Sequence, residues 1–240
     1  MTLAPKSIWL VLSLSTTIDF DRVKFWFKLA VQIETMSDIE SIIIPLDFTI
    51  DTARCRLRCP SAADIPDVFA ATRFAGFNDG MQWEPPDSID ELEQPLQDSL
   101  ADWAAGTTYC FTIADPTTNR LIGRIGIRKT ARAGVWNLGF WTHPEHQGQG
   151  YMTEAATATI EFGFEIGAAR IEASYALWNQ ASQRTLARVG MRLTRYIPHA
   201  FQKKGRWIEA NKMEITKREW LNFNSRQSES TVHRSFGARA

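Results

Sequence analysis

The chain contains few of the residues that build disulfide frameworks and metal centres. Its three cysteines, Cys55, Cys59 and Cys110, cannot form an even set of disulfides. The spacing Cys-x-x-x-Cys, on a stretch that alternates polar and apolar residues, is not a zinc-ligand spacing. We therefore expect three reduced, packed thiols in a cytoplasmic protein, and no bound metal.

Long apolar runs are also missing. No stretch reaches the ~18 apolar residues that a membrane span requires, although 44% of the residues are hydrophobic, an ordinary share for a soluble globule. The apolar run at residues 8–14 follows Lys6, but it is short and lacks a small-x-small cleavage site. We expect no signal peptide and no membrane partner.

The chain also lacks a net charge. The 27 basic residues balance 27 acidic ones, which argues against a nucleic-acid binder held by bulk electrostatics. The distribution is uneven, because residues 37–110 hold 14 acids against four arginines and residues 184–240 hold 13 bases against four acids. This split suits a protein that accepts a cationic partner on one side and a phosphorylated one on the other. Two solvated helix faces would produce the same split.

The sequence predicts three parts. Residues 1–50 form an N-terminal extension whose first 35 residues show no steady helical or strand period. Met36 opens a more conventional stretch, so we expect it to be the natural start. Residues 51–221 form one domain, and residues 222–240 turn polar and are expected to be a largely disordered tail.

Hydrophobic periodicity predicts a mixed α/β (α+β) domain. Helical spacing predicts helices at residues 61–73, 88–103, 151–166 and 179–189. Alternation predicts strands at residues 52–59, 109–114, 121–128, 135–141, 170–175, 191–197 and 206–215. The strands before residue 142 read as an antiparallel meander, whereas a right-handed crossover places strand 170–175 parallel to strand 135–141. We expect a mostly antiparallel central sheet with one parallel pair and flanking helices.

A glycine turn stands between strand 135–141 and helix 151–166. The turn is Gln147-Gly148-Gln149-Gly150, in which the two glycines adopt positive φ easily and leave the backbone open, and the helix that follows directs its positive end at the turn. We interpret the turn as a pyrophosphate site. A Rossmann dinucleotide site is an alternative, with Glu172 as its ribose acid. Against it, Thr153 replaces the third glycine and the glycines do not follow their strand directly.

Three segments carry a resemblance to a known family: HPEHQGQGYMTEA, EFGFEIGAARIEA and NQASQRTLARVGM. Gln147 to Met152 resembles the Gln/Arg-x-x-Gly-x-Gly/Ala signature of the GNAT superfamily of acetyl-CoA-dependent N-acetyltransferases. The whole set is similar to the Rim-type branch, the RimJ/RimL-like N-terminal acetyltransferases of ribosomal proteins. The resemblance covers about residues 52–220 and implies the GNAT fold, with strand 135–141 splayed from strand 170–175.

The resemblance implies that acetyl-CoA is the co-substrate. Backbone N–H groups from Gly148 to Met152 would bind its pyrophosphate. Its pantetheine arm would lie between the splayed strands, against main-chain groups near Trp141 and His143, and Asn179 would hold that arm. The cofactor-binding residues implied in this way are Trp141, Thr142, His143, Gln147, Gly148, Gln149, Gly150, Tyr151, Met152 and Asn179.

The resemblance also implies catalytic residues. Ser182 matches the serine proposed to protonate the departing thiolate, and Leu186 stands where other branches have a tyrosine. Relatives carry a glutamate base after the serine helix, whereas residues 198–202 hold His199 and no acid. His199, with an unperturbed pKa near ~6.5, is the candidate base. Without the resemblance, Asn179 is a plain N-cap, Ser182 a first-turn polar residue and His199 a surface residue of a hairpin.

The loop and helix before the meander are the expected acceptor site, with Trp83 and Glu84 as substrate-binding residues. The acids from Asp87 to Asp102 would attract a protonated amine; a solvated helix face is the alternative. We expect a higher acceptor KM when three of these acids are neutralised: Asp90, Glu91 and Glu93.

The predicted reaction is direct acetyl transfer to a primary amine in a ternary complex, because no cysteine or serine has a visible base partner for a covalent route. The acceptor is a small amine or a protein N-terminus, including that of a ribosomal protein, and the protein acts as a monomer or homodimer. The alternative is a non-catalytic acyl-CoA-binding or regulatory module that kept the coenzyme turn and lost its base.

Overall fold

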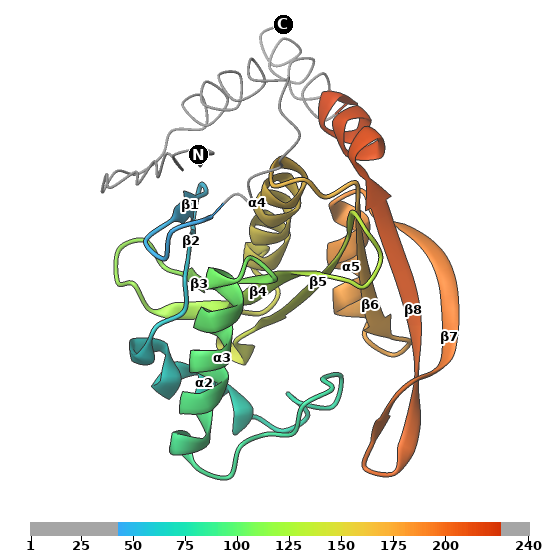
Figure 1. The fold of residues 1–240 in the computed structure, drawn as a ribbon. Helices are drawn as coiled ribbons and strands as arrows, with labels where there is room; N and C mark the ends of the chain where they lie inside the picture. The colour runs from blue at the N-terminus through green and yellow to red at the C-terminus, as the bar shows by residue number, and fades with distance from the viewer. Residues whose placement is uncertain (1–42, 227–240) are drawn as a thin grey trace, which may run out of the picture. The chain divides into compact units, whose positions relative to one another are not determined.

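The computed structural model describes residues 43–226 (Figure 1). The predictions for the extension before residue 43, including the start at Met36, and for residues 227–240 lie outside the described residues. None of the helices within residues 43–226 combines the length and the hydropathy that a membrane span requires.

Eight strands of the described chain form one sheet in the order β1-β2-β3-β4-β5-β6-β8-β7. The strands are β1 (Thr49–Asp51), β2 (Arg56–Arg58), β3 (Thr108–Ala114), β4 (Leu121–Lys129), β5 (Val135–Thr142), β6 (Arg170–Ala176), β7 (Arg192–Lys203) and β8 (Arg206–Thr216). The helical elements are η1 (Ala62–Asp64), α2 (Ile65–Thr72), η2 (Ile89–Leu92), α3 (Glu93–Ala104), η3 (Pro144–His146), α4 (Tyr151–Glu165) and α5 (Gln180–Arg188), and residues 217–226 are also helical.

One parallel pair interrupts an otherwise antiparallel sheet, as predicted. β5 and β6 run parallel and pair only at their beginnings, where Val135, Trp136 and Asn137 lie opposite residues 170–172. Both strands continue for several residues beyond this ladder without pairing. The two strands therefore part at the centre of the sheet, and the C-terminal half of each has a free edge toward the other.

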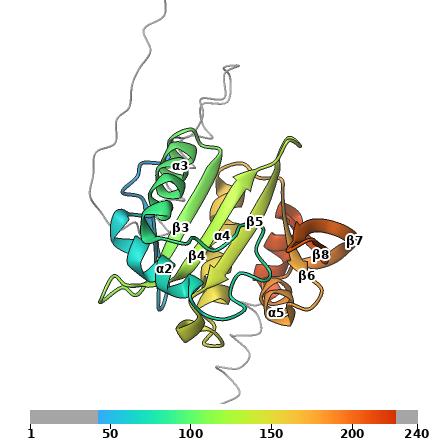
Figure 2. The same cartoon turned by 90° about the horizontal axis from the view of Figure 1, so that it is seen from below.

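Helix α4 packs across the diverging strands because its sequence leaves room for them. A Cβ atom at Gly163 would lie 2.4 Å from Ile127 Cδ1 of β4 and 3.0 Å from Ile171 Cδ1 of β6, so a larger residue there would force these isoleucine side chains to move. Figure 2 shows α2 and α3 at the β3 side of the sheet and the β7–β8 hairpin at the other end.

The core is strongly aromatic. The rings of Trp103, Tyr109, Phe111 and Phe162 join α3, β3 and α4 through edge-to-face contacts, with centroids 5.0 to 5.4 Å apart. Each ring is almost fully buried, and aromatic pairs of this geometry contribute beyond their buried area. This cluster holds α4, and hence the turn at its N-terminus, rigidly on the sheet.

The first predicted strand is shorter than expected. Residues 52–55 form a turn in which the Thr52 hydroxyl donates to the Cys55 carbonyl (2.9 Å), so β2 begins only at Arg56. A short strand, β1, precedes it and pairs with β2. The alternation that predicted one strand over residues 52–59 is thus divided between a turn and a strand.

The C-terminal predictions also need correction. β7 extends to Lys203, beyond the predicted end at Ile197, with register shifts between Ile197 and Phe201. The disorder predicted from Asn222 is wrong as far as residue 226, because residues 217–226 are helical. Phe223 anchors this helix: its ring lies 2.8 Å from where a Gly190 Cβ would stand, and 6.2 Å from the Trp220 ring.

Candidate active site

The glycine turn presents a row of unpartnered backbone donors. Gly148 (φ 75°) and Gly150 (φ 85°) adopt the left-handed conformation predicted for them. Among the described residues, the backbone N–H groups of residues 148–153 donate to no protein acceptor, and the helical ladder begins with the N–H of Glu154 donating to the Gly150 carbonyl (3.2 Å). Six consecutive N–H groups without a partner among the described residues, at the positive end of a 15-residue helix, are suited to binding an anion.

The two glutamines of the turn brace it. Gln147 Nε2 donates to the Thr142 carbonyl (3.3 Å), and Gln149 Nε2 donates to the Glu145 carbonyl (3.2 Å). Both side chains therefore hold the turn against the end of β5 and η3. Tyr151 follows at the first helical position and meets the His146 ring edge-on, and Met152 is buried beneath the turn.

Arg54 is a cation at this turn that the sequence did not reveal. Its Nη1 donates to the Gln149 carbonyl (3.0 Å), its guanidinium lies 4.8 Å from the centre of the Tyr151 ring, and its Nη2 lies 3.3 Å from where a Gly150 Cβ would stand. The contact with Gln149 spans 95 residues. No local pattern marks Arg54, because its alternating neighbourhood predicts an ordinary strand position.

Glu154 holds Arg54 in place. Its carboxylate accepts from the Arg54 backbone N–H (2.7 Å), from Arg54 Nε (2.8 Å) and from the Thr52 hydroxyl (2.6 Å). Burial by itself would raise the pKa of Glu154, but these hydrogen bonds outweigh it and hold the pKa below its usual value. Glu154 is therefore charged at neutral pH and fixes the guanidinium beside the turn.

Of the three β5-end residues implied by the resemblance, only Thr142 directs its backbone groups toward the parting strands. The His143 N–H donates to the Ile122 carbonyl of β4 (2.9 Å). Since backbone groups alternate in direction along a strand, those of Phe140 and Thr142 point the other way, toward β6. Main-chain contacts with a pantetheine arm would come from Phe140 and Thr142, and the N–H of His143 is already used in the sheet.

His143 stabilises the loop through its ring. The side chain is buried, its Nδ1 accepts from the Glu145 N–H (3.3 Å), and the Phe74 ring meets it edge-on. Burial lowers the pKa of His143, so the ring is neutral at pH 7.

The start of α5 places Asn179 and Ser182 together. Asn179 Oδ1 accepts from the Ser182 N–H (3.0 Å), which is an N-cap bond. The Asn179 amide still has its two donors, and a Cβ at Gly80 would lie 3.6 Å from that amide nitrogen. Ser182 is half-buried, and among residues 43–226 no hydrogen bond engages its hydroxyl. Leu186 is buried in the core.

His199 lies apart from this pair. It belongs to β7, the edge strand of the sheet, and β8 separates β7 from β6. The His199 side chain is exposed, and its ring lies 5.1 Å from the Trp207 ring. Within the described part of the chain, no contact joins His199 with Ser182, Asn179 or the turn.

Trp83 and Glu84 are tied to the β7–β8 hairpin. Lys203 is 6% exposed, and its ammonium donates to the Trp83 carbonyl (2.8 Å) and pairs with the Glu84 carboxylate (3.0 Å). Phe77 contacts the Trp83 ring (6.3 Å) and the Trp141 ring (5.3 Å), both edge-on. The irregular loop of residues 74–86 therefore connects the end of β5 with the hairpin.

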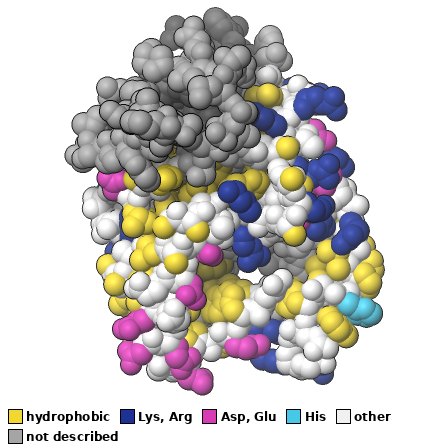
Figure 3. All heavy atoms as spheres, in the orientation of Figure 1, with side chains coloured by type: hydrophobic (Ala, Val, Ile, Leu, Met, Phe, Trp, Pro, Cys, Tyr) yellow, Lys and Arg dark blue, Asp and Glu magenta, His cyan; other side chains and the backbone are white. Residues whose placement is uncertain are grey.

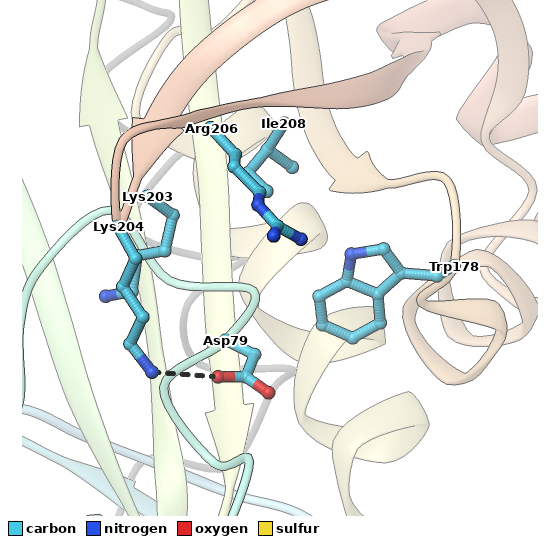
Figure 4. Close-up of a pocket in the computed structure, with 6 residues that line it drawn as sticks. All are labelled: Asp79, Trp178, Lys203, Lys204, Arg206 and Ile208. Atoms are coloured by element: carbon cyan, nitrogen blue, oxygen red, sulfur yellow. Dashed lines mark ion pairs between the residues drawn. The ribbon is translucent and has the colours of Figure 1, made fainter.

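A pocket of about 470 Å³ opens beside this loop (Figure 4). It is lined by Asp79, Trp178, Lys203, Lys204, Arg206 and Ile208. Lys204 and Asp79 face each other at 3.9 Å. The residues of the predicted acidic rim are exposed on η2 and α3 and do not line this pocket: Asp90, Glu91 and Glu93.

The charge split predicted from the sequence is visible on the surface. In Figure 3, acidic side chains gather at one end of the face and Lys and Arg side chains over the opposite side. No group of three or more histidine, cysteine or acidic side chains within residues 43–226 is arranged to hold a metal ion.

The dinucleotide alternative is not supported. Glu172, its ribose acid, is buried and paired with Lys212 (2.9 Å) and Arg132. The strands that precede the turn are antiparallel, whereas a dinucleotide fold builds its site from parallel βαβ units.

A family comparison decides the assignment. The family model for the acetyltransferase (GNAT) domain matches residues 54–192, which include the turn, the parted strands and Asn179 with Ser182. The chain belongs to the GNAT acetyltransferase family. Its fold is the mixed GNAT fold, as the sequence predicted.

Individual relatives agree with this assignment. The GNAT chain is 32% identical over 101 residues to the uncharacterized N-acetyltransferase YnaD of Bacillus subtilis (strain 168), a match that spans 42% of this chain and 59% of YnaD, less than two thirds of that relative. The structure of a putative ribosomal-protein-serine acetyltransferase from Vibrio cholerae superposes with a TM-score of 0.64 and 27% identity, covering 72% of this chain and 99% of the other. Mycobacterium smegmatis RimJ, solved with CoA-disulfide, shares the fold (TM-score 0.62, 20% identity, 72% and 89% covered).

Proposed function

We propose that this GNAT acetyltransferase moves the acetyl group of acetyl-CoA to a primary amine by direct transfer in a ternary complex. The observation that carries the proposal is the row of six free N–H groups at residues 148–153, with Arg54 beside it, at the end of the parted strand β5. A pyrophosphate there would meet oriented donors and a fixed cation.

The parted strands would receive the pantetheine arm. Its amides would pair with the backbone of Phe140 and Thr142, which faces β6 without a partner strand. The Asn179 amide donors, left free by the N-cap bond of its oxygen, would hold the arm from the α5 side. This arrangement brings the thioester to the centre of the sheet, close to Ser182.

The chemical step moves three protons. The acceptor ammonium first loses a proton; the amine nitrogen then attacks the thioester carbonyl, the C–N bond forms and the C–S bond breaks. The departing thiolate takes up one proton and the nitrogen gives up its second, so that one proton in all is released to solvent. Ser182, with its hydroxyl free of hydrogen bonds among the described residues, would protonate the departing thiolate. His199, on the edge strand, would take the ammonium proton through water.

The cysteines support direct transfer. Burial raises the pKa of the Cys55 and Cys59 thiols to about 11 and that of Cys110 above its usual value. Since the thiolate is the nucleophile, none of the three is an attacking group at neutral pH.

We propose two classes of acceptor, a protein N-terminus and a small amine. A protein N-terminus, such as that of a ribosomal protein, is supported by the likeness to the putative ribosomal-protein-serine acetyltransferase from Vibrio cholerae. A small amine is supported by the pocket beside Asp79, whose volume suits a small molecule.

A second function is favoured by one observation. Residues 198–202 carry no carboxylate, and the His199 ring lies tilted against the Trp207 ring, without a contact to Ser182 among the described residues. A chain without a base could bind acyl-CoA without turning it over.

Thiol release from acetyl-CoA over a panel of amines and N-terminal peptides tests the two functions. We expect turnover with at least one acceptor and saturable acetyl-CoA binding by calorimetry. Tight coenzyme binding with no turnover on any acceptor would favour the binding module, and no coenzyme binding would contradict both.

A further inference from the structure

The pocket lined by Asp79, Trp178 and Arg206 has the wrong charge for a plain cationic amine. We propose that the acceptor is a small amine that also carries an anionic group, a carboxylate or a phosphate, and that Arg206 binds that group. This inference rests on the proposed acetyl transfer and names the substrate class of the same site. The opposite choice, a polyamine or basic peptide, would bring positive charge to a wall that already holds Lys203, Lys204 and Arg206.

The pocket lies on the acceptor side of the site. Trp178 lines it and directly precedes Asn179, the proposed pantetheine contact. A Cβ at Gly80 would lie 3.0 Å from the Trp178 ring and 3.6 Å from the Asn179 amide nitrogen, so the loop that carries Trp83 passes directly over both. None of the residues of the coenzyme turn lines the pocket. An acceptor seated there would lie next to the residue that positions the thioester arm.

The three cationic side chains of the pocket differ in whether a protein group already neutralises their charge. Lys203 is buried and satisfied by the Trp83 carbonyl and the Glu84 carboxylate. Lys204 faces Asp79 at 3.9 Å. The Arg206 guanidinium, in contrast, forms no hydrogen bond or ion pair with any described residue, although its backbone pairs with Lys203 in the β7–β8 ladder.

The side chains that are already neutralised and the one that is not point in different directions. Figure 4 shows the guanidinium of Arg206 and the indole of Trp178 pointing into the same space above Asp79, while the Lys203 ammonium points away from it. Arg206 is therefore the cation left for a ligand, and its planar fork matches the geometry of a carboxylate or a phosphate.

The remaining residues of the pocket indicate the chemistry of the rest of the acceptor molecule. The Trp178 side chain is 55% exposed, and Ile208 lies beside it. A large exposed indole at the mouth of a pocket offers a flat apolar surface to a ligand. The volume of about 470 Å³ lies within the range of small-molecule sites, roughly 300–1,000 Å³. The chemistry fits an amino acid or an amino phosphate with an apolar or planar body.

Matched acceptor pairs test the proposal on the full chain. Thiol release is measured for phenylalanine against phenethylamine, tryptophan against tryptamine, 4-aminobutyrate against butylamine, and phosphoethanolamine against ethanolamine. We expect the anionic member of at least one pair to be preferred by about ten- to one-hundred-fold in kcat/KM, the range that a charge-assisted hydrogen bond provides. Carboxylate and phosphate pairs distinguish the two sources of the anion.

Variants assign the preference to Arg206. Arg206→Gln should abolish the preference by raising the KM of the anionic member, with its kcat and the acetyl-CoA KM unchanged, and Arg206→Lys should restore part of it. Arg195→Gln is the matched control, because Arg195 is an exposed arginine of the same hairpin that does not line the pocket.

Three results would overturn the proposal while leaving acetyl transfer intact. They are an equal or better rate for the neutral amines, a preference that survives Arg206→Gln, and turnover restricted to N-terminal peptides with amidated C-termini. A raised acetyl-CoA KM in Arg206→Gln would place the pocket with the coenzyme and would also contradict it. Coenzyme binding without turnover of any acceptor would instead contradict the proposed function itself.

Discussion

At the scale of the residue, the site depends on backbone conformation more than on side chains. Gly150 has a φ of 85°, and the N–H groups that follow it have no protein partner among the described residues. A side chain at Gly150 would strain the backbone and stand 3.3 Å from Arg54 Nη2. Anion binding at the turn thus requires that no side chain stands at Gly150. A substitution there should weaken the binding of the ligand more than it destabilises the fold.

Gly150→Val should abolish acetyl-CoA binding, because the branched side chain closes the turn and turns the N–H groups away. Isothermal titration calorimetry with acetyl-CoA measures this. Gly167→Val is the control: Gly167 ends the same helix with a φ of 104° and open space around it, so it should lose about 1–2 kcal/mol of stability and retain affinity. Retained affinity in Gly150→Val would mean that the cofactor binds elsewhere.

Arg54→Gln should weaken acetyl-CoA binding by about ten-fold, because it removes the cation that Glu154 fixes beside the turn. Arg56→Gln is the matched control, since Arg56 pairs with Asp51 and contributes no contact to the turn. Equal coenzyme affinity of the Arg54 variant and the wild type would remove Arg54 from the site.

Ser182→Ala should lower kcat on the order of 100-fold, because the thiolate would then leave without its proton donor. The acetyl-CoA dissociation constant should not change. Gln183→Ala, an exposed neighbour in the same helical turn, should leave kcat unchanged. A kcat of wild-type size in Ser182→Ala would show that solvent protonates the thiolate.

At the scale of the element, the loop of residues 74–86 is held by a buried lysine. Lys203 reaches 120 residues back along the chain to the Trp83 carbonyl, and its ammonium is nearly inaccessible to water. A buried cation is stable only when it is paired, so the pair Lys203 and Glu84 fixes the loop on the hairpin. The loop therefore keeps one position over Trp178 and Asn179.

Lys203→Met should raise the acceptor KM while leaving acetyl-CoA affinity unchanged, because it frees the loop and leaves the Trp83 carbonyl without its donor. The free energy of unfolding should fall by about 1–3 kcal/mol, the cost of one unsatisfied buried group. Steady-state kinetics and urea unfolding measure the two effects. A changed coenzyme affinity with an unchanged acceptor KM would contradict this role.

At the scale of the whole molecule, ion pairs join segments far apart in the sequence and make stability depend on pH. Glu219 accepts from the hydroxyl and N–H of Thr216 and pairs with Arg192, and these hydrogen bonds lower its pKa from the ordinary 4.5 to about 2. Asp64 is also shifted downward, since hydrogen bonds from Arg58, Ser61 and Thr112 outweigh the effect of its burial. Both carboxylates bind protons more readily in the unfolded chain.

The free energy of unfolding should therefore be highest above about pH 5 and should decrease as the pH falls through the window from 4.5 to 2. Urea unfolding at a series of pH values measures it. Glu219→Gln should show a shallower decrease, because it lacks the group with the lowered pKa. Parallel curves for the variant and the wild type would contradict the assignment to Glu219.

Part of this protein followed from the sequence alone, because the signals were local. The positive-φ glycines Gly148 and Gly150, the cap Asn179 and the alternation of the central strands each depend on a few neighbouring residues. Those signals, with the resemblance that they carried, predicted the fold, the coenzyme turn and the family. They failed where tertiary contacts outweigh local preference, as for the helical residues 222–226 that Phe223 anchors.

Contacts between segments that are distant in the sequence were decided only by the tertiary structure. Arg54 meets Gln149 across 95 residues, and Lys203 meets Trp83 across 120. The pocket likewise joins Asp79, Trp178 and Arg206, which no spacing relates. A local sequence pattern predicts the backbone conformation of the residues that form it. The partner of a long side chain depends instead on which elements the sheet brings together. The glycine turn could therefore be predicted from the sequence, and the cations beside it and in the pocket could not.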